Sequence, residues 1–589
     1  MGIWKAIGGR EEDGHWVGHD PSNQFPVYTR GNTGEVYPEV FTPLTFSIAA
    51  DATELAMRNA MLESGLLRPK EVDGIPLTTA IGAGVFGGYS YLNLSLQRLA
   101  SARVLGGSAG DADINFLGDT DPPPHEPLPN ERNLAATLGS TRYVWKLLNT
   151  TELPALADDQ TRVDLFLAEL PDPTEATDDQ LRQPVDTFMP LFSELFERHL
   201  KVTFAAGIAV AVLNGICDKR LGEPLLAIQL LAGLGDVDSA APSQAMWDLS
   251  RQINDDPDLS AAFDAGIDDL VDQLGGTADD EPHSPTAAFW TAFSSFLDTF
   301  GSRGPNEWDT AFDTWGTDPT LALTLIDRMR GADDSHDPTH QGRRLAAEAE
   351  ALEAECLGRL NWIYRWLFTR TLRSARLYSR SRERTKTTVV RAIHGLRLLT
   401  MELAARLAER TGCERSDMWL LLDDELDDYM AEPGSFAELI AERRRQHQLL
   451  NEYEPPFFFS GQQPPLSEWN RKDATMEPLS DGQVISGIPG CPGVARGRAR
   501  VVTNPGDPRG LSPGDVLVAP LTDPAWTPLF VPAEAVIVDV GAVMSHAVIV
   551  SRELGIPCVV SATSATKRIP DGAMVEVDGT KGTVTVLSV

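Results

Sequence analysis

The spacing of apolar residues indicates a long helical region in the first three quarters of the chain. From about residue 130 to 450, apolar side chains recur at helical intervals, and acidic loops separate the helical stretches. Residues 345–412 continue this pattern over a length that predicts two long helices packed together. Residues 202–217 form the longest apolar run, which is shorter than a membrane span and contains Asn214. We therefore expect this run to be a buried core helix.

The pattern changes after residue 453. Residues 454–484 are rich in proline and polar residues and lack periodicity, which is typical of a flexible linker that lets a following domain move. Residues 485–589 contain six short β-like runs, separated by glycine and proline turns, and one helix. The chain is thus predicted to be multidomain, with a large, mainly α-helical domain at 1–453 and a small α/β domain at 485–589.

Composition and charge narrow the classes of partner. The formal net charge is −35 and the isoelectric point is about 4.6, which opposes nucleic acid or an anionic membrane as the main partner. The five cysteines are scattered, without a CxxC pair or a histidine at ligand spacing, so no metal site is expected. The first residues lack a secretory apolar segment. These features predict a cytoplasmic protein with reduced thiols.

The segment "GAGVFG" formally fits the dinucleotide-binding pattern through Gly82, Gly84 and Gly87. That pattern requires a preceding buried strand and a βαβ unit to be meaningful. The preceding "GIPLTTAI" is a poor buried strand, and no series of parallel strands follows. A phosphate-binding loop of the Walker type is also not found in the sequence. We therefore do not expect a nucleotide site in this segment.

His546 lies at the start of the helix predicted in the C-terminal region, within "GAVMSHAVIVSRELGIPCVV" at 541–560. Ser545 is a favourable N-cap residue, and Gly555 favours the end of the helix. Backbone N–H groups at such an N-terminus attract anions, phosphate included. Taken alone, a histidine in this position is more often a partly exposed capping residue. Arg552 and Glu553 fall on the first two turns, where an exposed ion pair is the ordinary expectation.

Three segments identify a family resemblance. "GIPGCPGVARGRARVV", "DVLVAPLTDPAWTPLF" and the histidine segment occur in the order found in the mobile phosphohistidine domain of phosphoenolpyruvate-utilising enzymes, and they closely resemble it. This family includes phosphoenolpyruvate synthase, pyruvate phosphate dikinase and rifampicin phosphotransferase. The resemblance covers 485–589 and implies a swivelling domain in which His546 carries a phosphoryl group between two distant sites, supported by Ser545. Ala542 and Met544 stand where the commonest pattern has glycine and threonine.

A weaker resemblance extends through the first 450 residues. "YTRGNTGEVYPEVFTPLTFS", "FGGYSYLNLSLQRL" and "FGSRGPNEWDTAFDTW" look like segments of the acceptor-binding domain of rifampicin phosphotransferase. Arg382 and Lys386, in "RERTK", match a basic pair of that domain. One helical turn separates them, so they could clamp phosphoryl oxygens from one helix face, or form an ordinary solvated basic face. In some relatives a histidine occupies the position of Ser302.

Two glycine-marked turns supply further candidates for substrate binding. Asn32 and Glu35 lie in "RGNTGEVYP", and Arg303 and Glu307 lie in "GSRGPNEWD". Such turns often line sites on a rigid scaffold, and they equally often contain buried networks that stabilise the turn itself. Four tryptophans of the helical region, at positions 308, 315, 362 and 366, would suit an apolar alcohol or phenol, although tryptophans at helical spacing are more often core residues.

The resemblance also implies a partner. Relatives usually begin with an ATP-grasp domain, which this sequence does not show, and the layout looks like the larger subunit of phenylphosphate synthase. We therefore expect a dikinase-type phosphotransferase component. A separate ATP-grasp subunit, which binds ATP and Mg²⁺, phosphorylates His546, and the phosphoryl group passes to a small-molecule hydroxyl in the helical domain. No cofactor is expected in this chain. The alternatives are a non-catalytic ligand-binding or regulatory relative and a phosphorylation-driven dehydratase or cyclase.

Overall fold

The computed structural model describes most of the chain in two compact units. It describes residues 18–117, 122–128, 130–223, 225–235, 238, 241–281, 283–505, 511–542 and 545–589, so the first 17 residues and Met544 lie outside the described residues. The first unit comprises the described residues up to Ala209, with Trp308–Ala311 and Arg384–Thr475. The second unit comprises Val210–Glu307, Phe312–Glu383 and Met476–Val589.

This division differs from the predicted boundaries in two respects. Residues 210–307 and 312–383, expected in one helical domain with residues 1–209, belong to the same compact unit as the C-terminal sheet. The predicted linker at 454–484 contains the strands β7 (Phe458–Ser460) and β8 (Asn470–Arg471). Phe459 is buried and packs on aromatic rings of the first unit. This packing holds the proline-rich stretch in a β-strand conformation. Within this stretch, the longest exposed run without helix or strand is residues 472–478.

A four-stranded antiparallel sheet organises the first unit, in the order β4 (Ala83–Phe86), β5 (Tyr89–Asn93), β2 (Val27–Thr29) and β7. Two small pairs accompany it, β1 (Asp20–Pro21) with β3 (Thr79–Ala80), and β6 (Tyr453–Glu454) with β8. The helices of this unit are α1 (Thr33–Val36), α2 (Pro43–Glu63), α3 (Leu94–Arg103), α4 (Ala109–Leu117), α5 (Leu134–Asn149), α6 (Ala155–Glu169), α7 (Asp178–Arg182), α17 (Leu426–Ala431), α18 (Ala437–Asn451) and parts of α8 and α16.

The longest apolar run forms part of α8 (Pro184–Ile216), a helix of 33 residues. By length and composition alone, the stretch Asp178–Leu221 could cross a membrane, because an 18-residue window within it has a mean hydropathy of 1.8. Phe188, Phe192 and Phe196 follow one another at helical spacing, stack ring on ring and are buried in the core of the first unit. The predicted run at 202–217 likewise has one buried face, which is the pattern of a core helix.

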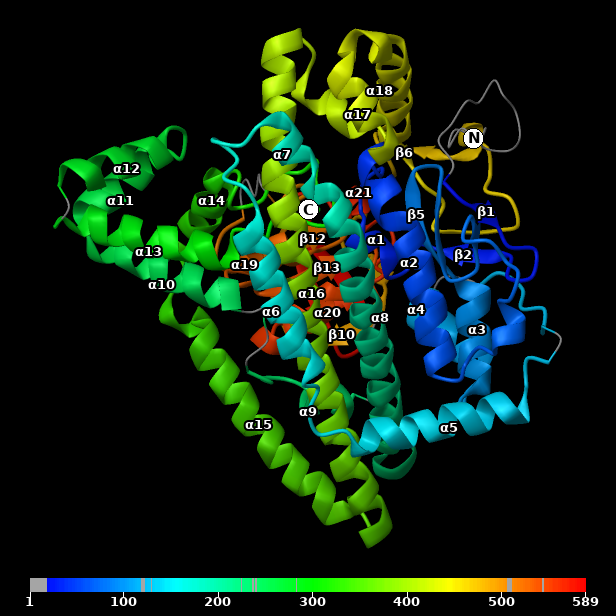
Figure 1. The fold of residues 1–589 in the computed structure, drawn as a ribbon. Coiled ribbons are helices and arrows are strands. Elements are labelled where there is room, and N and C mark those ends of the chain that lie inside the picture. The colour runs from blue at the N-terminus through cyan, green and yellow to red at the C-terminus, as the bar shows by residue number, and fades with distance from the viewer. Residues whose placement is uncertain are drawn as a thin grey trace. The chain divides into compact units, whose positions relative to one another are not determined.

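The two long helices predicted at 345–412 are α15 (Pro338–Arg359) and α16 (Trp362–Thr411), the latter with 50 residues. Figure 1 shows α16 as one continuous ribbon. An ion pair between Arg376 of α16 and Glu353 of α15, with a nitrogen–oxygen distance of 2.7 Å, joins them in the second unit. The other helices of this unit are α9 (Leu226–Leu230), α10 (Ala241–Asp255), α11 (Pro257–Ala265), α12 (Leu270–Asp280), α13 (Pro285–Phe300), α14 (Pro319–Arg330), α19 (Thr527–Phe530), α20 (His546–Leu554) and α21 (Ala565–Arg568).

An eight-stranded sheet lies in the C-terminal part of the second unit, and it includes all six predicted strands. Its order is β10 (Ile488–Cys491), β14 (Cys558–Val560), β13 (Ala535–Val538), β12 (Asp515–Ala519), β11 (Val494–Val501), β15 (Met574–Asp578), β16 (Thr583–Ser588) and β9 (Val484–Ser486). The four strands β14, β13, β12 and β11 run parallel. Both faces are covered, since alternate residues of β12 lie in two different cores. The predicted small α/β fold is confirmed.

The glycine pattern at 82–87 belongs to a β-hairpin rather than to a nucleotide-binding loop. Gly87 and Gly88 connect β4 to β5 with positive φ angles of 54° and 78°, the geometry of a two-residue hairpin turn. The backbone N–H groups of Ile81, Gly82 and Ala83 donate to the carboxylate of Glu54, each at 2.9 Å. A protein carboxylate thus occupies the N–H groups that a phosphate would need.

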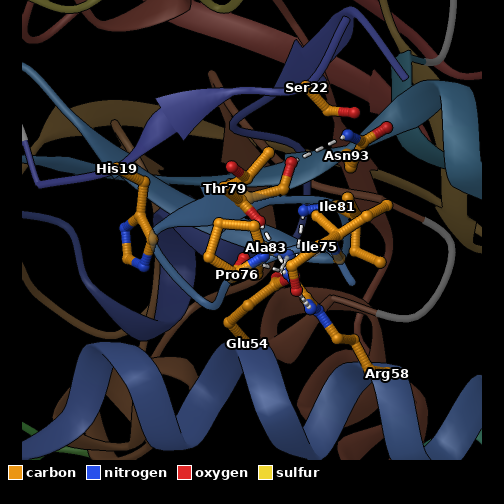
Figure 2. A network of polar contacts seen from close by, with 12 residues as sticks. His19, Ser22, Glu54, Arg58, Ile75, Pro76, Thr79, Ile81, Ala83 and Asn93 are labelled. Carbon is orange, nitrogen blue, oxygen red and sulfur yellow. Dashed lines mark hydrogen bonds and ion pairs between the residues drawn. The ribbon is translucent and has the colours of Figure 1, made fainter. Parts of the chain in front are cut away.

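Glu54 lies on α2 and is fully buried. Its Oε1 pairs with Arg58 Nε at 2.7 Å, and Arg58 also donates to three backbone carbonyls, so the carboxylate and the guanidinium together hold residues 75–83 on the helix. Figure 2 shows Glu54 pointing from α2 toward Ile81 and Ala83, with Arg58 one turn further along. Burial raises the pKa of Glu54, and Arg58 opposes this shift.

Replacing Glu54 by glutamine is expected to destabilise the protein by about 3–5 kcal/mol, because it leaves the Arg58 charge buried without its anion. Urea unfolding followed by circular dichroism measures the effect. Glu63→Gln on the same helix is the matched control, since the Glu63 carboxylate is 41% exposed and pairs with Lys201 at the surface. The control should cost less than about 1 kcal/mol. Equal losses in the two variants would contradict the assignment of Glu54 as the anchor.

Candidate functional site

His546 is the first residue of α20, and its helix has the ends that the sequence predicts. Ser545 has extended backbone angles, and its Oγ accepts the N–H of Val548 at 3.5 Å. Gly555 ends the helix in the left-handed conformation, with φ of 68°. The helix therefore directs its N-terminal N–H groups to the region of His546.

Two threonine hydroxyls flank the imidazole of His546. Its Nδ1 lies 3.1 Å from Oγ1 of Thr522, and its Nε2 lies 3.0 Å from Oγ1 of Thr527. The edge of the ring faces Phe530, with 6.0 Å between ring centroids, and the residue is only 8% exposed. The expectation of a partly exposed capping histidine is therefore wrong. Neighbouring residues of the second unit cover the ring.

The loop that carries these threonines is tied to the turn that contains Arg303 and Glu307. Asp523 Oδ1 accepts the N–H of Ala525 at 2.8 Å, and Oδ2 accepts the N–H of Asn306 at 3.4 Å. Arg303 Nη1 and Glu307 Oε1 form an ion pair at 2.9 Å, with side chains 2% and 1% exposed. This geometry matches the turn-stabilising alternative for Arg303 and Glu307, and it places them beside the histidine loop.

Arg552 and Glu553 form an ion pair, as expected, but the pair is buried. Arg552 Nη2 lies 3.3 Å from Glu553 Oε1, and both side chains are less than 10% exposed. The other oxygen of Glu553 accepts the N–H of Leu234 at 3.0 Å. Burial raises the pKa of Glu553, opposed by the Arg552 charge. The expectation of exposure is wrong because other segments of the second unit cover this face of α20, which the local sequence does not reveal.

Arg382 and Lys386 lie one turn apart on α16, as predicted, and both side chains are half-buried. Arg382 belongs to the second unit and Lys386 to the first. Nε of Arg382 lies 3.4 Å from Oε1 of Glu383, so the charge of Arg382 is partly compensated by a neighbour on the same helix.

In the first unit, a cluster of aromatic residues lies beside Thr385, the residue that precedes Lys386 on α16. Oγ1 of Thr385 lies 3.0 Å from Nδ1 of His199, a residue of α8. The ring of His199 lies 5.8 Å from the ring of Trp308, which in turn lies 6.3 Å from the ring of Tyr37. His199, Thr385 and Tyr37 are not among the sequence-predicted site residues. Tyr37 could have been found, because it lies in the quoted segment that carries Asn32 and Glu35.

Hydrogen bonds from Arg30, two residues before Asn32, stabilise the turn that contains Asn32 and Glu35. Arg30, which is buried, donates from Nη2 to the carbonyls of Tyr37 and Pro38 at 3.3 and 3.2 Å. Asn32 precedes α1 with a positive φ of 75°, and its side chain makes no capping hydrogen bond to that helix within the described residues. The half-buried side chains of Asn32 and Glu35 therefore sit on a rigid turn that ends at Tyr37.

The four tryptophans fall into two classes. Trp308 and Trp315 are buried, Trp308 in the core of the first unit and Trp315 in that of the second. Trp362 and Trp366 begin α16 and are 79% and 42% exposed. Only Trp308 adjoins both His199 and the turn of Asn32. Within the described ranges, no group of three or more histidine, cysteine, aspartate or glutamate side chains is arranged to hold a metal ion.

Two family comparisons match the residues described above. Residues 511–582 match the family described as "PEP-utilising enzyme, mobile domain", and this range includes Thr522, Thr527 and His546. The C-terminal sheet domain is therefore similar to the mobile domain of the PEP-utilising enzymes over these residues. Residues 198–383 match the "Rifampicin phosphotransferase fourth domain", a range that begins one residue before His199 and includes Arg382. These matches confirm the predicted resemblance of the C-terminal domain over 511–582 and that of the helical region over 198–383.

Similar proteins extend the likeness along the chain. The prodigiosin synthesizing transferase of Serratia marcescens is 26% identical over 97% of this chain. The rifampicin phosphotransferases of Bacillus cereus and Streptomyces sviceus are 25% and 29% identical over 90% and 68% of it. The chain spans 64%, 62% and 46% of the length of these three relatives, respectively.

Proposed function

We propose that the protein is a phosphotransferase component in which His546 carries a phosphoryl group to a small-molecule hydroxyl. The observation that carries this proposal is the position of His546, at the N-terminus of α20 and between two threonine hydroxyls, inside a domain that matches the PEP-utilising mobile domain. Backbone N–H groups at this helix end can hold phosphate oxygens without a fixed cation, which lets the loaded domain leave one site for another.

The burial of His546 supports a moving domain. Both ring nitrogens are within hydrogen-bonding distance of a hydroxyl and the ring is covered, so the imidazole cannot meet a phosphoryl donor in the conformation described. In the proposed cycle the domain of residues 485–589 swings on the exposed segment 472–478. An ATP-grasp partner, with ATP and Mg²⁺, loads His546 by a dikinase-type reaction. A layout like phenylphosphate synthase, with the ATP-binding part on another chain, belongs to this proposal.

The acceptor is proposed to react in the helical part of the chain, where Arg382 and Lys386 would compensate the charge of the transferred group. Asn32 and Glu35 are proposed to contact the acceptor from their rigid turn. Arg303 and Glu307 are proposed to act less directly, because their mutual ion pair holds the turn that binds the loop of Asp523. The five cysteines are free thiols, which agrees with the proposed cytoplasmic location.

A second outcome of the same chemistry is favoured by one observation. The relative that matches 97% of this chain is a prodigiosin synthesizing transferase, whereas other relatives are rifampicin phosphotransferases. In this second outcome, phosphorylation activates a hydroxyl that later leaves, instead of giving a stable phosphate ester. In the first outcome, a phosphate ester of the acceptor accumulates. In the second, inorganic phosphate accumulates together with a chemically changed acceptor.

We expect phosphoramidate, a small donor with a P–N bond, to transfer one phosphoryl group to the protein. Intact-mass measurement detects the gain, and a phosphohistidine is lost in acid but kept in alkali. Chasing the loaded protein with a mixture of aromatic and aliphatic alcohols should return it to its original mass, and ³¹P NMR identifies the product. Failure to load, or an acid-stable modification, would contradict the proposed function.

A further inference from the structure

We propose that the turn between α15 and α16 binds peripherally to the surface of an anionic lipid bilayer. The surface, called the α15–α16 tip below, consists of Trp362, Ile363 and Trp366, followed along α16 by Arg370 and Arg373. It belongs to the second unit, and Figure 1 shows α15 and α16 meeting at the lower end of both ribbons. This inference does not depend on the carrier role proposed for the C-terminal histidine.

The first turns of α16 present large apolar side chains to solvent. Trp362, Ile363 and Trp366 are 79%, 51% and 42% exposed. They are the exposed large apolar side chains among the described residues of 210–307 and 312–383. An exposed tryptophan gives up much of the hydrophobic free energy that its burial would provide. Three such side chains gathered at one turn therefore indicate a partner that covers them.

These side chains lie on an ordered turn. Oδ1 of Asn361 accepts the N–H groups of Ile363 and Tyr364, each at 3.1 Å, and so caps the helix. The guanidinium of Arg220, in the π-helical turn Cys217–Leu221, stacks over the ring of Tyr364 at 4.3 Å from the centroid. The exposure of the tip is thus a property of a capped and packed helix end, and fraying does not explain it.

The charge of the tip is opposite to that of the whole chain. Between Glu355 and Glu383 the sequence contains seven arginines and no aspartate or glutamate, whereas the formal net charge of the chain is −35. α16 has no acidic residue in its first turn, although the positive end of a helix dipole favours one. Helix stability therefore does not explain this arginine run, and charge complementarity indicates an anionic partner.

Carboxylates of neighbouring elements reduce this positive charge without reversing it. They are Asp218, Glu223, Glu353 and Glu355. Glu223 and Glu355 pair with Arg359, at nitrogen–oxygen distances of 2.7 and 3.4 Å. Glu353 pairs with Arg376 of α16 at 2.7 Å. Seven arginines against these four carboxylates leave the region net positive.

The order of apolar and basic groups along α16 favours a bilayer. One face of the helix carries, at intervals of three and four residues, Trp362, Trp366, Arg370 and Arg373. With a rise of about 1.5 Å per residue, the Cα atoms of the two arginines lie about 6 and 10 Å further along the axis than that of Trp366. Tryptophans that enter the interface would therefore leave the guanidinium groups at the level of the lipid phosphates.

The small size of the tip supports the same choice. A stable protein interface usually buries about 800 Å² on each partner, and three apolar side chains at one turn are too few for its centre. A bilayer requires only a wedge that enters by about 5–10 Å. The acidic remainder of the chain opposes the approach weakly, because charges beyond about 8 Å are largely screened at physiological salt. The cytoplasmic leaflet carries anionic lipid, which agrees with the proposed location.

Co-sedimentation of the full chain with lipid vesicles tests the proposal. At about 0.15 M salt, wild type should bind phosphatidylcholine vesicles that contain about a quarter phosphatidylglycerol, and bind pure phosphatidylcholine vesicles much more weakly. Trp362→Ser and Trp366→Ser should each lower the partition coefficient by about tenfold, because the apolar wedge is lost. Arg370→Gln and Arg373→Gln should each lower it by about fivefold on the anionic vesicles and leave it unchanged on the neutral ones.

Matched variants outside the tip serve as controls. Trp145→Ser removes a tryptophan that is 56% exposed on α5 in the first unit. Arg445→Gln removes an arginine that is 67% exposed on α18 in the same unit. Both should bind the anionic vesicles as wild type does. Circular dichroism checks that every variant is folded, which separates loss of binding from loss of structure.

Three results would overturn the proposal. The first is a wild type that does not bind the anionic vesicles, or binds neutral vesicles equally well. The second is binding by folded tryptophan and arginine variants of the tip that equals wild-type binding. The third is retention on immobilised poly-L-glutamate that depends on the tip, without binding to vesicles, which would assign the tip to an acidic protein partner. Phosphoramidate loading does not enter the test, so none of these results affects the proposed function.

Discussion

Replacing His546 by alanine is expected to abolish the uptake of acid-labile phosphate altogether. The side chain supplies the only nucleophilic nitrogen that the proposed cycle uses, and a methyl group cannot form a P–N bond. The substitution also removes the two contacts to Thr522 and Thr527, but it leaves the helix N-terminus and its cap in place. Intact-mass measurement after incubation with phosphoramidate, before and after acid treatment, reports the loss.

Ser545→Ala is the matched control for this experiment. It removes the hydroxyl that accepts the N–H of Val548 and should destabilise the helix by about 1 kcal/mol, without removing the nucleophile. Uptake of acid-labile phosphate should persist in this variant, and its rate is compared directly with that of wild type. Acid-labile phosphate on His546→Ala, in the same amount as on wild type, would place the phosphoryl carrier on another residue.

Replacing Lys386 by alanine is expected to leave the loading of His546 intact and to slow discharge to acceptor by about two to four orders of magnitude. This is the usual scale for removing a charge that stabilises a transition state. Arg382→Lys should also slow discharge, because a point charge does not reproduce the planar fork of a guanidinium. Measuring decay of the pre-loaded protein in the presence of 1-naphthol isolates this half-reaction from loading.

Arg391→Ala on the same helix provides the comparison. Arg391 is 35% exposed and pairs with Asp164 at 2.8 Å, so its loss should change neither loading nor discharge. If Lys386→Ala and Arg382→Lys both discharge at the wild-type rate, the basic pair is an ordinary solvated face of α16, and the acceptor reacts elsewhere.

Local sequence patterns were sufficient for the two long helices and for the strands β11–β16. The periodicity at 345–412 predicted α15 and α16, and the short β-like runs after residue 485 predicted the strands β11–β16. Residues 458–460 were missed as a strand because proline-rich surroundings are typical of loops. Their place in the sheet depends on pairing with β2, more than 400 residues earlier in the chain. Hydrogen bonds at that separation leave little trace in local composition.

The candidate site likewise has features that local sequence predicts and features that it does not. The histidine motif, its cap and the spacing of Arg382 and Lys386 could be predicted, because each depends on neighbours within one or two helical turns. The burial of His546, Arg552 and Glu553 could not be predicted, because a helix face is covered by segments from elsewhere in the chain. For the same reason, the motif that contains Thr522 and Thr527 did not reveal that their hydroxyls contact the imidazole of His546.

By itself, the sequence determined that this protein has a helical region, a small α/β domain and a histidine at a helix N-terminus, because short-range periodicity and capping encode those features. Tertiary structure alone decided what surrounds them. It placed a carboxylate from α2 on the backbone of the glycine-rich hairpin, and it brought His199, Trp308 and Tyr37 together from three distant segments. Side-chain packing between such distant segments depends on how the elements fold together, and the local sequence of any one segment does not encode it.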